Sequence, residues 1–214
     1  MIRLRKSPPP TWIVRNRARK TAEYIAAPAN SKPSPWRAAD VVAALKDECR
    51  LKCIYCEGYV DDVSYIAVEH IAPKELFPER VLDWRNLGLA CTRCNTNKGS
   101  YWAESDALRL INPYEDDPGD HLSHSGPLTV SVLGSSRGEN TLRRLKFADR
   151  PDLLMSRMRR IQELDVRIRN WHAETDVEKK ELLADDVRDA MAPDREFSAV
   201  LVAYAEFCGF LQEV

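Results

Sequence analysis

The stretch from Cys53 to Lys98 carries two closely spaced cysteine pairs, Cys53-Ile54-Tyr55-Cys56 and Cys91-Thr92-Arg93-Cys94. Thiolates separated by two residues can both reach one ion from a tight turn, and two such turns complete the tetrahedron that Zn²⁺ prefers. The sequence therefore predicts a structural zinc ion on these four thiolates, whose binding contributes to folding. The two remaining cysteines, Cys49 and Cys208, are expected to be small buried side chains.

The segment between the two pairs is 34 residues long, whereas a simple zinc ribbon has roughly 15 to 20 there. This segment contains Glu69-His70-Ile71-Ala72-Pro73-Lys74 and then Asn86, and the last cysteine is followed by Asn95 and Lys98. Four thiolates leave no open coordination position on zinc. We therefore expect the chemistry to lie at these other residues rather than at the zinc ion.

In order, spacing and residue type, this stretch resembles the HNH endonucleases, which have a ββα-metal core. The resemblance rests on four motifs: Cys53-x-x-Cys56, Glu69-His70-x-x-Pro73-Lys74, Asn86-Leu87 and Cys91-x-x-Cys94-Asn95-x-x-Lys98-Gly99. The sequence departs from the family at Glu69, where aspartate is commoner, and at Asn95, where histidine also occurs. Both side chains still offer oxygen to a hard cation.

The resemblance implies a role for each of these residues. His70 would be the general base, because a neutral imidazole takes a proton from water as it attacks phosphorus. Glu69 and Asn95 would hold one catalytic Mg²⁺ or Mn²⁺, and Asn86 would tie the loop and orient His70. The phosphates of the substrate would be contacted by three basic residues, Lys98, Lys74 and Arg93.

The chain divides into three predicted parts. Residues 1–37 form a basic, proline-rich, extended arm with a short helix around 12–25, which lies across the domain or contacts phosphates. Residues 38–110 form the nuclease core with its zinc knuckles. Residues 111–214 begin with loops and a hairpin, including a strand over 128–133, and continue as helices. The predicted fold class is α+β.

Within these parts, apolar spacing and capping residues predict particular elements. A helix should start near Ala38, with Asp40 as its N-cap, and another should run from Asn95 to about residue 107. A strand pair or hairpin is expected over 59–68. Helical spacing from 141 to 168 is interrupted near Pro151, and further helices cover 178–191 and the segment after Pro193. The outer face of the long helix is expected to carry Arg157, Arg159, Arg160, Arg167 and Arg169.

Charge is distributed unevenly although the net charge is only -1. Residues 1–40 hold nine Lys and Arg against two acids, and residues 173–214 hold four against eleven. A basic arm favours a phosphate-rich partner, whereas an acidic tail favours solvent or a protein partner. With no apolar run of about 18 residues and no signal peptide, we expect a cytoplasmic protein that does not enter a membrane.

A looser resemblance extends over most of the chain. The opening Met1–Lys6, the segment Asn112-Pro113-Tyr114 and the step from Leu145 to Leu153 are similar to the HNH subunits that accompany an ATPase in Septu-type and retron-linked phage defence. This resemblance implies a partner, an ATPase of the ABC or SMC type. The expected substrate is DNA, with tRNA or other RNA as the less favoured target.

A different class of function stays open at this point. A zinc-stapled module that binds nucleic acid or a protein without cutting needs the four cysteines and the basic arm. It has no use for Glu69, His70 and Asn95 together, which favours the enzyme.

Overall fold

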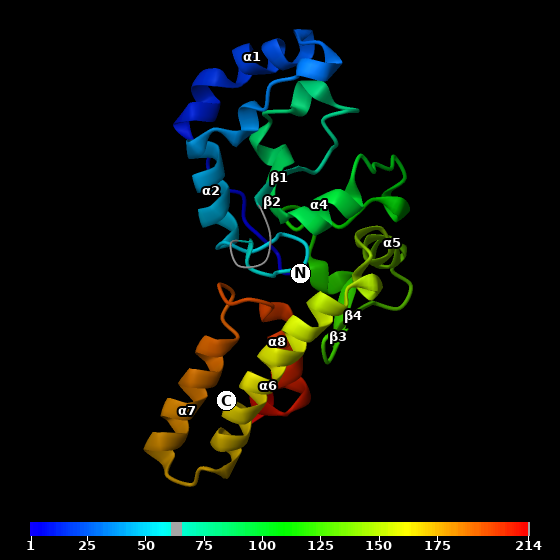
Figure 1. Ribbon diagram of the computed structural model, residues 1–214. Coiled ribbons are helices and arrows are strands. Elements are labelled where there is room, and N and C mark those ends of the chain that lie inside the picture. The colour runs from blue at the N-terminus through cyan, green and yellow to red at the C-terminus, as the bar shows by residue number, and fades with distance from the viewer. Residues whose placement is uncertain (61–65, 214) are drawn as a thin grey trace.

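The computed structural model of the protein describes residues 1–60 and 66–213. Figure 1 shows an elongated molecule, with α1 (Thr11–Ala26) at one end, a small sheet in the middle and a helical layer at the other end. In the middle, β1 (Ile66–His70) pairs antiparallel with β2 (Leu87–Cys91), and α4 (Thr92–Lys98) follows β2 directly. Helices combined with small sheets confirm the predicted α+β class, and the middle region has the predicted ββα order.

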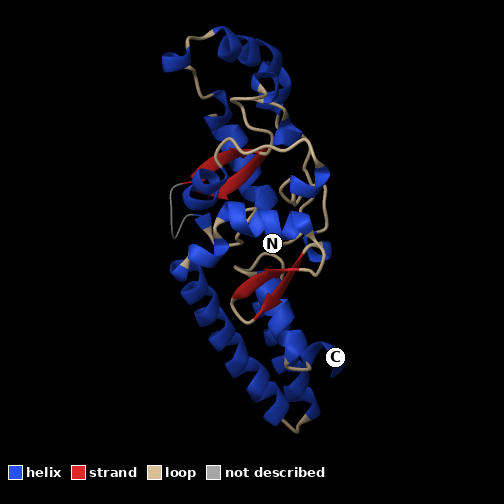
Figure 2. Cartoon of the chain, turned by 90° about the vertical axis from the view of Figure 1, so that its right-hand side faces the viewer, coloured by secondary structure: helices blue, strands red, loops and turns tan. Residues whose placement is uncertain are grey.

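The other elements are distributed on either side of this unit, as the secondary-structure colouring in Figure 2 makes clear. The helices and strands are α2 (Ala39–Cys49), β3 (Leu122–Ser125), β4 (Leu128–Ser131), α5 (Ser136–Leu145), α6 (Pro151–Ala173), α7 (Val177–Ala190), α8 (Ser198–Phe207) and α9 (Phe210–Glu213). Single turns of 3-10 helix are η1 (Ala29–Ser31), η2 (Pro35–Arg37), η3 (Pro78–Arg80), η4 (Trp84–Asn86), η5 (Asp106–Leu108), η6 (Pro118–Asp120) and η7 (Phe147–Asp149).

The first ten residues are extended and lie across the middle region. The backbone N–H of Leu4 donates to the Pro113 carbonyl at 2.7 Å, and the Lys6 ammonium reaches Glu48 at 2.8 Å and the Leu87 carbonyl at 2.6 Å. The short helix predicted near 12–25 is confirmed as α1. The predicted boundaries of the three parts of the chain stay predictions.

The helix predicted to start near Ala38 is confirmed, but its predicted N-cap was wrong, and so was the predicted extent of the helix at Asn95. α2 begins at Ala39, so Ala38 is its N-cap and Asp40 lies in the first turn, where a carboxylate interacts favourably with the helix dipole. α4 begins at Thr92 rather than Asn95, because the Cys91 side chain caps it, and it ends at Lys98 instead of continuing to residue 107. Of the strand pair predicted over 59–68, only β1 lies in the described chain; residues 61–65 are outside the described residues.

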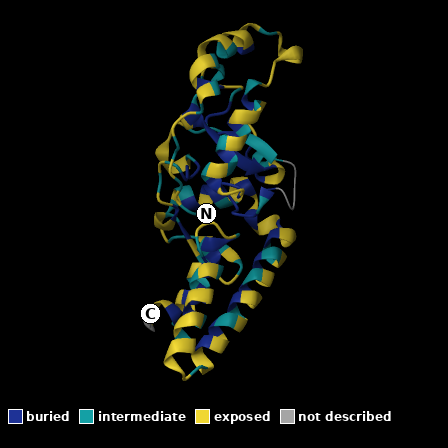
Figure 3. Ribbon diagram, turned by 90° about the vertical axis from the view of Figure 1, so that its left-hand side faces the viewer, coloured by how far each residue is buried: buried dark blue, intermediate teal, exposed yellow. Residues whose placement is uncertain are grey.

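The C-terminal helices follow the predicted pattern. The helical spacing is broken where expected, since Pro151 occupies the first turn of α6 after η7. The predicted hairpin is β3 and β4, joined by Gly126-Pro127 with Gly126 at a φ of 54°. Figure 3 shows the buried faces of the long helices turned inward and their exposed faces outward. None of the described helices has the length and apolarity needed to span a bilayer.

Arg157 corrects one detail of that pattern. It was predicted on the outer face of α6, but only 1% of it is exposed. Its Nη1 donates to the Pro127 carbonyl at 3.1 Å and to the Thr129 hydroxyl at 2.8 Å. The helix therefore presents a cation to the interior, next to the β3–β4 hairpin.

Gly138 in α5 tests the packing of that helix against the hairpin. A Cβ there would collide with the His121 carbonyl oxygen and approach Ser131 Cβ at 3.2 Å. Because backbone atoms cannot move aside cheaply, Gly138→Ala should destabilise the chain by about 1–3 kcal/mol in urea unfolding. Gly119→Ala is the control, since its Cβ would meet only the Asp117 side chain at 3.3 Å. Equal stability of the two variants would contradict the packing described.

Candidate active site and metal centre

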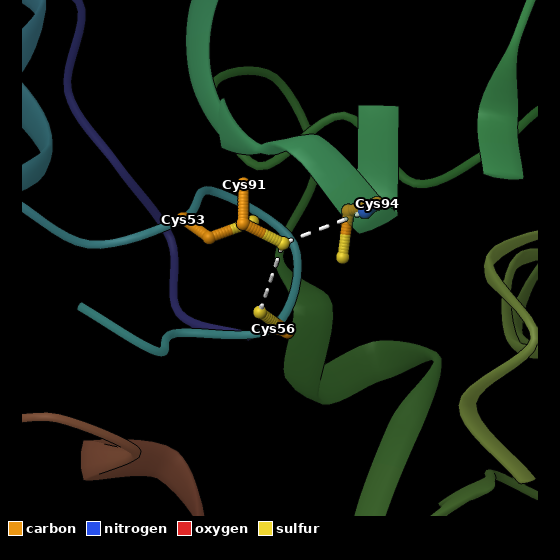
Figure 4. Close-up of side chains that lie close together, drawn as sticks. All are labelled: Cys53, Cys56, Cys91 and Cys94. Carbon is orange, nitrogen blue, oxygen red and sulfur yellow. Dashed lines mark hydrogen bonds between the residues drawn. The ribbon is translucent and has the colours of Figure 1, made fainter. Parts of the chain in front are cut away.

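The four predicted zinc ligands lie together. Their sulfur atoms are all within 4.8 Å of one another and all four residues are buried. The sulfurs of Cys56 and Cys91 are 3.9 Å apart, close to the roughly 3.8 Å edge of a tetrahedron with Zn–S bonds of about 2.3 Å. Figure 4 shows the side chains converging from two segments. The donor set fits a closed, structural zinc site, as predicted.

Backbone hydrogen bonds hold the two cysteine turns in place. In the first turn, the Cys53 N–H donates to the Gly58 carbonyl at 2.9 Å, and the Ile54 N–H donates to Leu89 of β2 at 3.0 Å. In the second, Cys91 Sγ accepts from the Cys94 N–H at 3.4 Å and starts α4. Both cysteine turns are thereby fixed to β2 and to the start of α4.

Zinc binding can be tested by replacing one ligand. Cys91→Ser should lose the tightly held Zn²⁺, about one per chain, and much of the fold, because site formation contributes to folding. Metal analysis and circular dichroism would measure both. Cys208→Ser is the matched control, since Cys208 is only half-buried and outside the cluster, whereas Cys49 is fully buried. A stable, metal-free Cys91→Ser protein would argue against a structural zinc ion.

His70 ends β1 with one ring nitrogen engaged. Its Nε2 lies 3.1 Å from the Val81 carbonyl oxygen, which can only accept, so Nε2 carries the proton and Nδ1 keeps its lone pair. The ring meets Trp36 edge-on, with the ring centroids 4.9 Å apart. Burial lowers the pKa of His70 to about 4. The imidazole is therefore neutral at pH 7, with Nδ1 able to accept a proton.

Asn86 holds the loop that carries Val81. Its amide oxygen accepts from the Ala72 N–H at 2.7 Å, and its Nδ2 donates to the carbonyls of Ala72 and Arg80 at 3.0 and 3.2 Å. These bonds join the residues just after His70 to the residue just before Val81. Asn86 therefore ties together the loop whose Val81 carbonyl contacts His70.

Glu69 forms a buried ion pair and does not line the groove beside His70. Its carboxylate lies 2.7 Å from the Lys98 ammonium, and both side chains are almost fully buried. Lys98 also donates to the His70 carbonyl at 2.8 Å. Burial raises the pKa of the Glu69 carboxyl, and the Lys98 ammonium opposes that shift. The pair links β1 to the last turn of α4.

Removing one partner of this pair should be costly. Lys98→Met leaves the Glu69 carboxylate buried without a counter-ion, which should lower the unfolding free energy by about 3–5 kcal/mol. Lys74→Met is the control because its ion pair with Glu75 is half-exposed and should contribute no more than about 1 kcal/mol. Chemical unfolding of both variants gives the comparison, and similar stabilities would exclude a buried charge pair.

A groove of about 1170 Å³ opens beside His70. Asn95 lines it, and no described residue forms a hydrogen bond with the Asn95 amide. Other side chains that line it are Tyr24, Lys32, Trp36, Arg37, Lys74 and Glu75. Glu69 is absent from the lining. The structure thus brings His70 and Asn95 to one groove, whereas Glu69 is buried against Lys98.

The three predicted phosphate contacts have different surroundings. Lys74 lies at the groove, with its ammonium 5.7 Å from the Trp36 ring. Lys98 is buried beneath the strand, bound to Glu69. Arg93 is exposed and pairs with Asp152 on the zinc side of the molecule. Of these three predicted phosphate contacts, only Lys74 therefore lines the groove with His70.

His121 and His124, which follow an acidic, proline-containing loop, each lie within hydrogen-bond distance of a hydroxyl group. His121 Nδ1 lies 2.8 Å from Ser135 Oγ, and His124 Nδ1 lies 3.3 Å from Thr129 Oγ1. Within residues 1–60 and 66–213, the cysteines are the one group of three or more His, Cys, Asp and Glu side chains arranged for a metal.

Several residues of the site carry no individual sequence signal. The Val81 carbonyl, which sets the His70 tautomer, is a backbone group, so its residue type is uninformative. Lys32, Trp36 and Arg37 come from a segment before the cysteines. That segment belongs to the arm that was expected to lie across the domain or to contact phosphates, and its Trp36 ring contacts His70.

The middle region also matches a known class of protein. Residues 53–101 match the family model for HNH endonucleases, so the chain carries an HNH domain around His70 and the zinc ligands.

Two named relatives extend the similarity beyond that domain. The chain is 34% identical over 144 residues to the Septu protein PtuB of Bacillus thuringiensis, an alignment that covers 62% of this chain and 54% of the relative. It is 30% identical over 121 residues to the Septu protein PtuB of Bacillus mycoides (strain KBAB4), covering 43% and 41%. The chain spans about half the length of these relatives. The resemblance to HNH and Septu-type proteins is confirmed.

Proposed function

We propose that the protein is a metal-dependent HNH endonuclease that hydrolyses phosphodiester bonds in DNA. The observation that carries this proposal is His70, a buried histidine of lowered pKa that lies in the segment matching the HNH model and lines a groove together with Lys32, Arg37 and Lys74. A module that only binds nucleic acid has no need for a buried, neutral histidine at its groove.

His70 would act as the general base. Its Nε2–H is held by the Val81 carbonyl, and the loop that carries Val81 is held by Asn86. Nδ1 is then positioned to take a proton from water as the water attacks phosphorus. Lys74, Lys32 and Arg37 would bring the phosphate backbone to the groove, because each adds positive charge to its wall.

A divalent cation, Mg²⁺ or Mn²⁺, would supply charge stabilisation to the transition state and the leaving oxygen. Of the two ligands that the HNH resemblance implies, Asn95 fits, since its amide is unengaged and lines the groove. Glu69 does not fit while Lys98 holds it. We assign Glu69 and Lys98 to positioning β1 against α4, and we derive no catalytic step through Glu69.

The biological role of the nuclease and its protein partner are a separate proposal. Likeness to two proteins named Septu protein PtuB supports a role in phage defence. We propose that an ATPase of the ABC or SMC type works alongside the nuclease, in agreement with the resemblance to HNH subunits of such systems.

The test is cleavage of plasmid DNA with added Mg²⁺ or Mn²⁺, with and without a candidate ATPase. His70→Ala should lower the rate by about 10²–10⁴-fold, the usual contribution of general base catalysis, while the variant still binds zinc. His172→Ala is the control, because His172 is exposed and contacts only the far helical layer. tRNA as a second substrate separates DNA from RNA cleavage.

The competing function is a zinc-stapled module that binds nucleic acid without cutting it. It predicts equal DNA binding by wild type and His70→Ala and no cleavage by either under any of these conditions. That result would overturn the nuclease proposal.

A further inference from the structure

The zinc site poses a charge problem. Four thiolates and one Zn²⁺ have a formal charge of -2, and all four cysteines are buried. A buried charge is costly unless opposite charge lies close by. We therefore expect buried, positively charged side chains next to the cysteines.

Arg150, the residue before α6, is one such cation. Its Nη1 lies 3.2 Å from the Cys94 sulfur, and only 6% of the residue is exposed. Its Nη2 also meets Asp152 at 3.3 Å, but that carboxylate is half-exposed and shared with Arg93. The thiolate is thus the buried partner of this guanidinium.

Arg157, two turns further along α6, is a second buried cation. It is more deeply buried than Arg150, and no carboxylate in the described chain lies within ion-pair distance of it. Its Nη1 is bound to neutral oxygens, and its Nε and Nη2 have no hydrogen-bond partner. Burial lowers the pKa of Arg157, and the Cys56 thiolate is the foremost group opposing that shift, followed by Glu57.

Glu57 already has cations of its own. Its carboxylate meets the amino nitrogen of Met1 at 2.6 Å and Lys52 at 3.5 Å, and it accepts a bond from Ser198 at 2.8 Å. The charge of Glu57 is therefore balanced by groups other than Arg157.

We propose that Arg150 is a counter-ion of the zinc tetrathiolate and that its contact with Cys94 docks the start of α6 beside the zinc site. The zinc ion then joins two parts of the molecule: it closes the cysteine turns and it keeps the start of the helical layer in place. Without zinc the cysteine turns open and the contact between Arg150 and Cys94 is lost, so the first turns of α6 detach.

Zinc affinity tests the first half of the proposal. In the full chain, Arg150→Met should hold Zn²⁺ about 10- to 100-fold more weakly in competition with a chromogenic chelator, the range for groups that support a metal's ligands. Arg159→Met is the matched control, since Arg159 is exposed on the same helix. Arg150→Lys, which keeps the charge, should bind zinc more tightly than Arg150→Met.

An affinity of Arg150→Met equal to that of Arg159→Met would overturn the proposal, provided that circular dichroism shows folded protein. So would identical affinities for Arg150→Met and Arg150→Lys, because the proposal requires charge rather than shape.

Hydrogen exchange tests the second half and does not depend on any variant folding. When zinc is withdrawn from the wild-type chain, amides of residues 150–160 should lose protection before those of α7. Equal loss in α6 and α7, or unchanged protection in α6, would overturn the proposed docking. Neither readout involves cleavage, so the result is independent of the nuclease proposal.

Discussion

The convergence of four sulfurs on one point is the constraint on which the structure depends. It brings a turn before β1 to the junction of β2 and α4, although 34 residues separate the cysteine pairs. Once these ends are joined, β1 pairs with β2 in a register that sets His70 opposite Leu87. The histidine is therefore held at one end of the sheet, and the cysteines hold the other end, where Cys91 pairs with Ile66.

A second constraint acts inside the loop between the strands. Asn86 bonds three backbone groups, and Glu69 and Lys98 close the opposite side of β1. The two sets of contacts leave one side of the His70 ring for the groove. Asn86, Glu69 and Lys98 are thus engaged in supporting contacts, whereas His70 lines the groove in which a substrate can bind.

Residue type and spacing predicted the parts of this site that depend on chemistry shared by many chains. Paired cysteines, a histidine after a carboxylate and an asparagine before a strand each have few physical uses, so their positions could be read directly. The buried environment of Arg157, the contact of Glu69 with Lys98 and the Val81 carbonyl could not be, because each depends on which segments pack together. The extent of α4 was also missed, since a cysteine side chain caps it in a role usually filled by Ser, Thr, Asp or Asn.

The wall of the groove has a consequence for how this chain could be divided or recombined. Trp36, Lys32 and Arg37 precede the HNH match, yet they border the same groove as His70 and Asn95. A graft of residues 53–101 into another protein would carry the histidine and the thiolates without the ring that contacts the histidine. The smallest portable unit of this site therefore begins before the zinc-binding turns, near the aromatic segment at Tyr24.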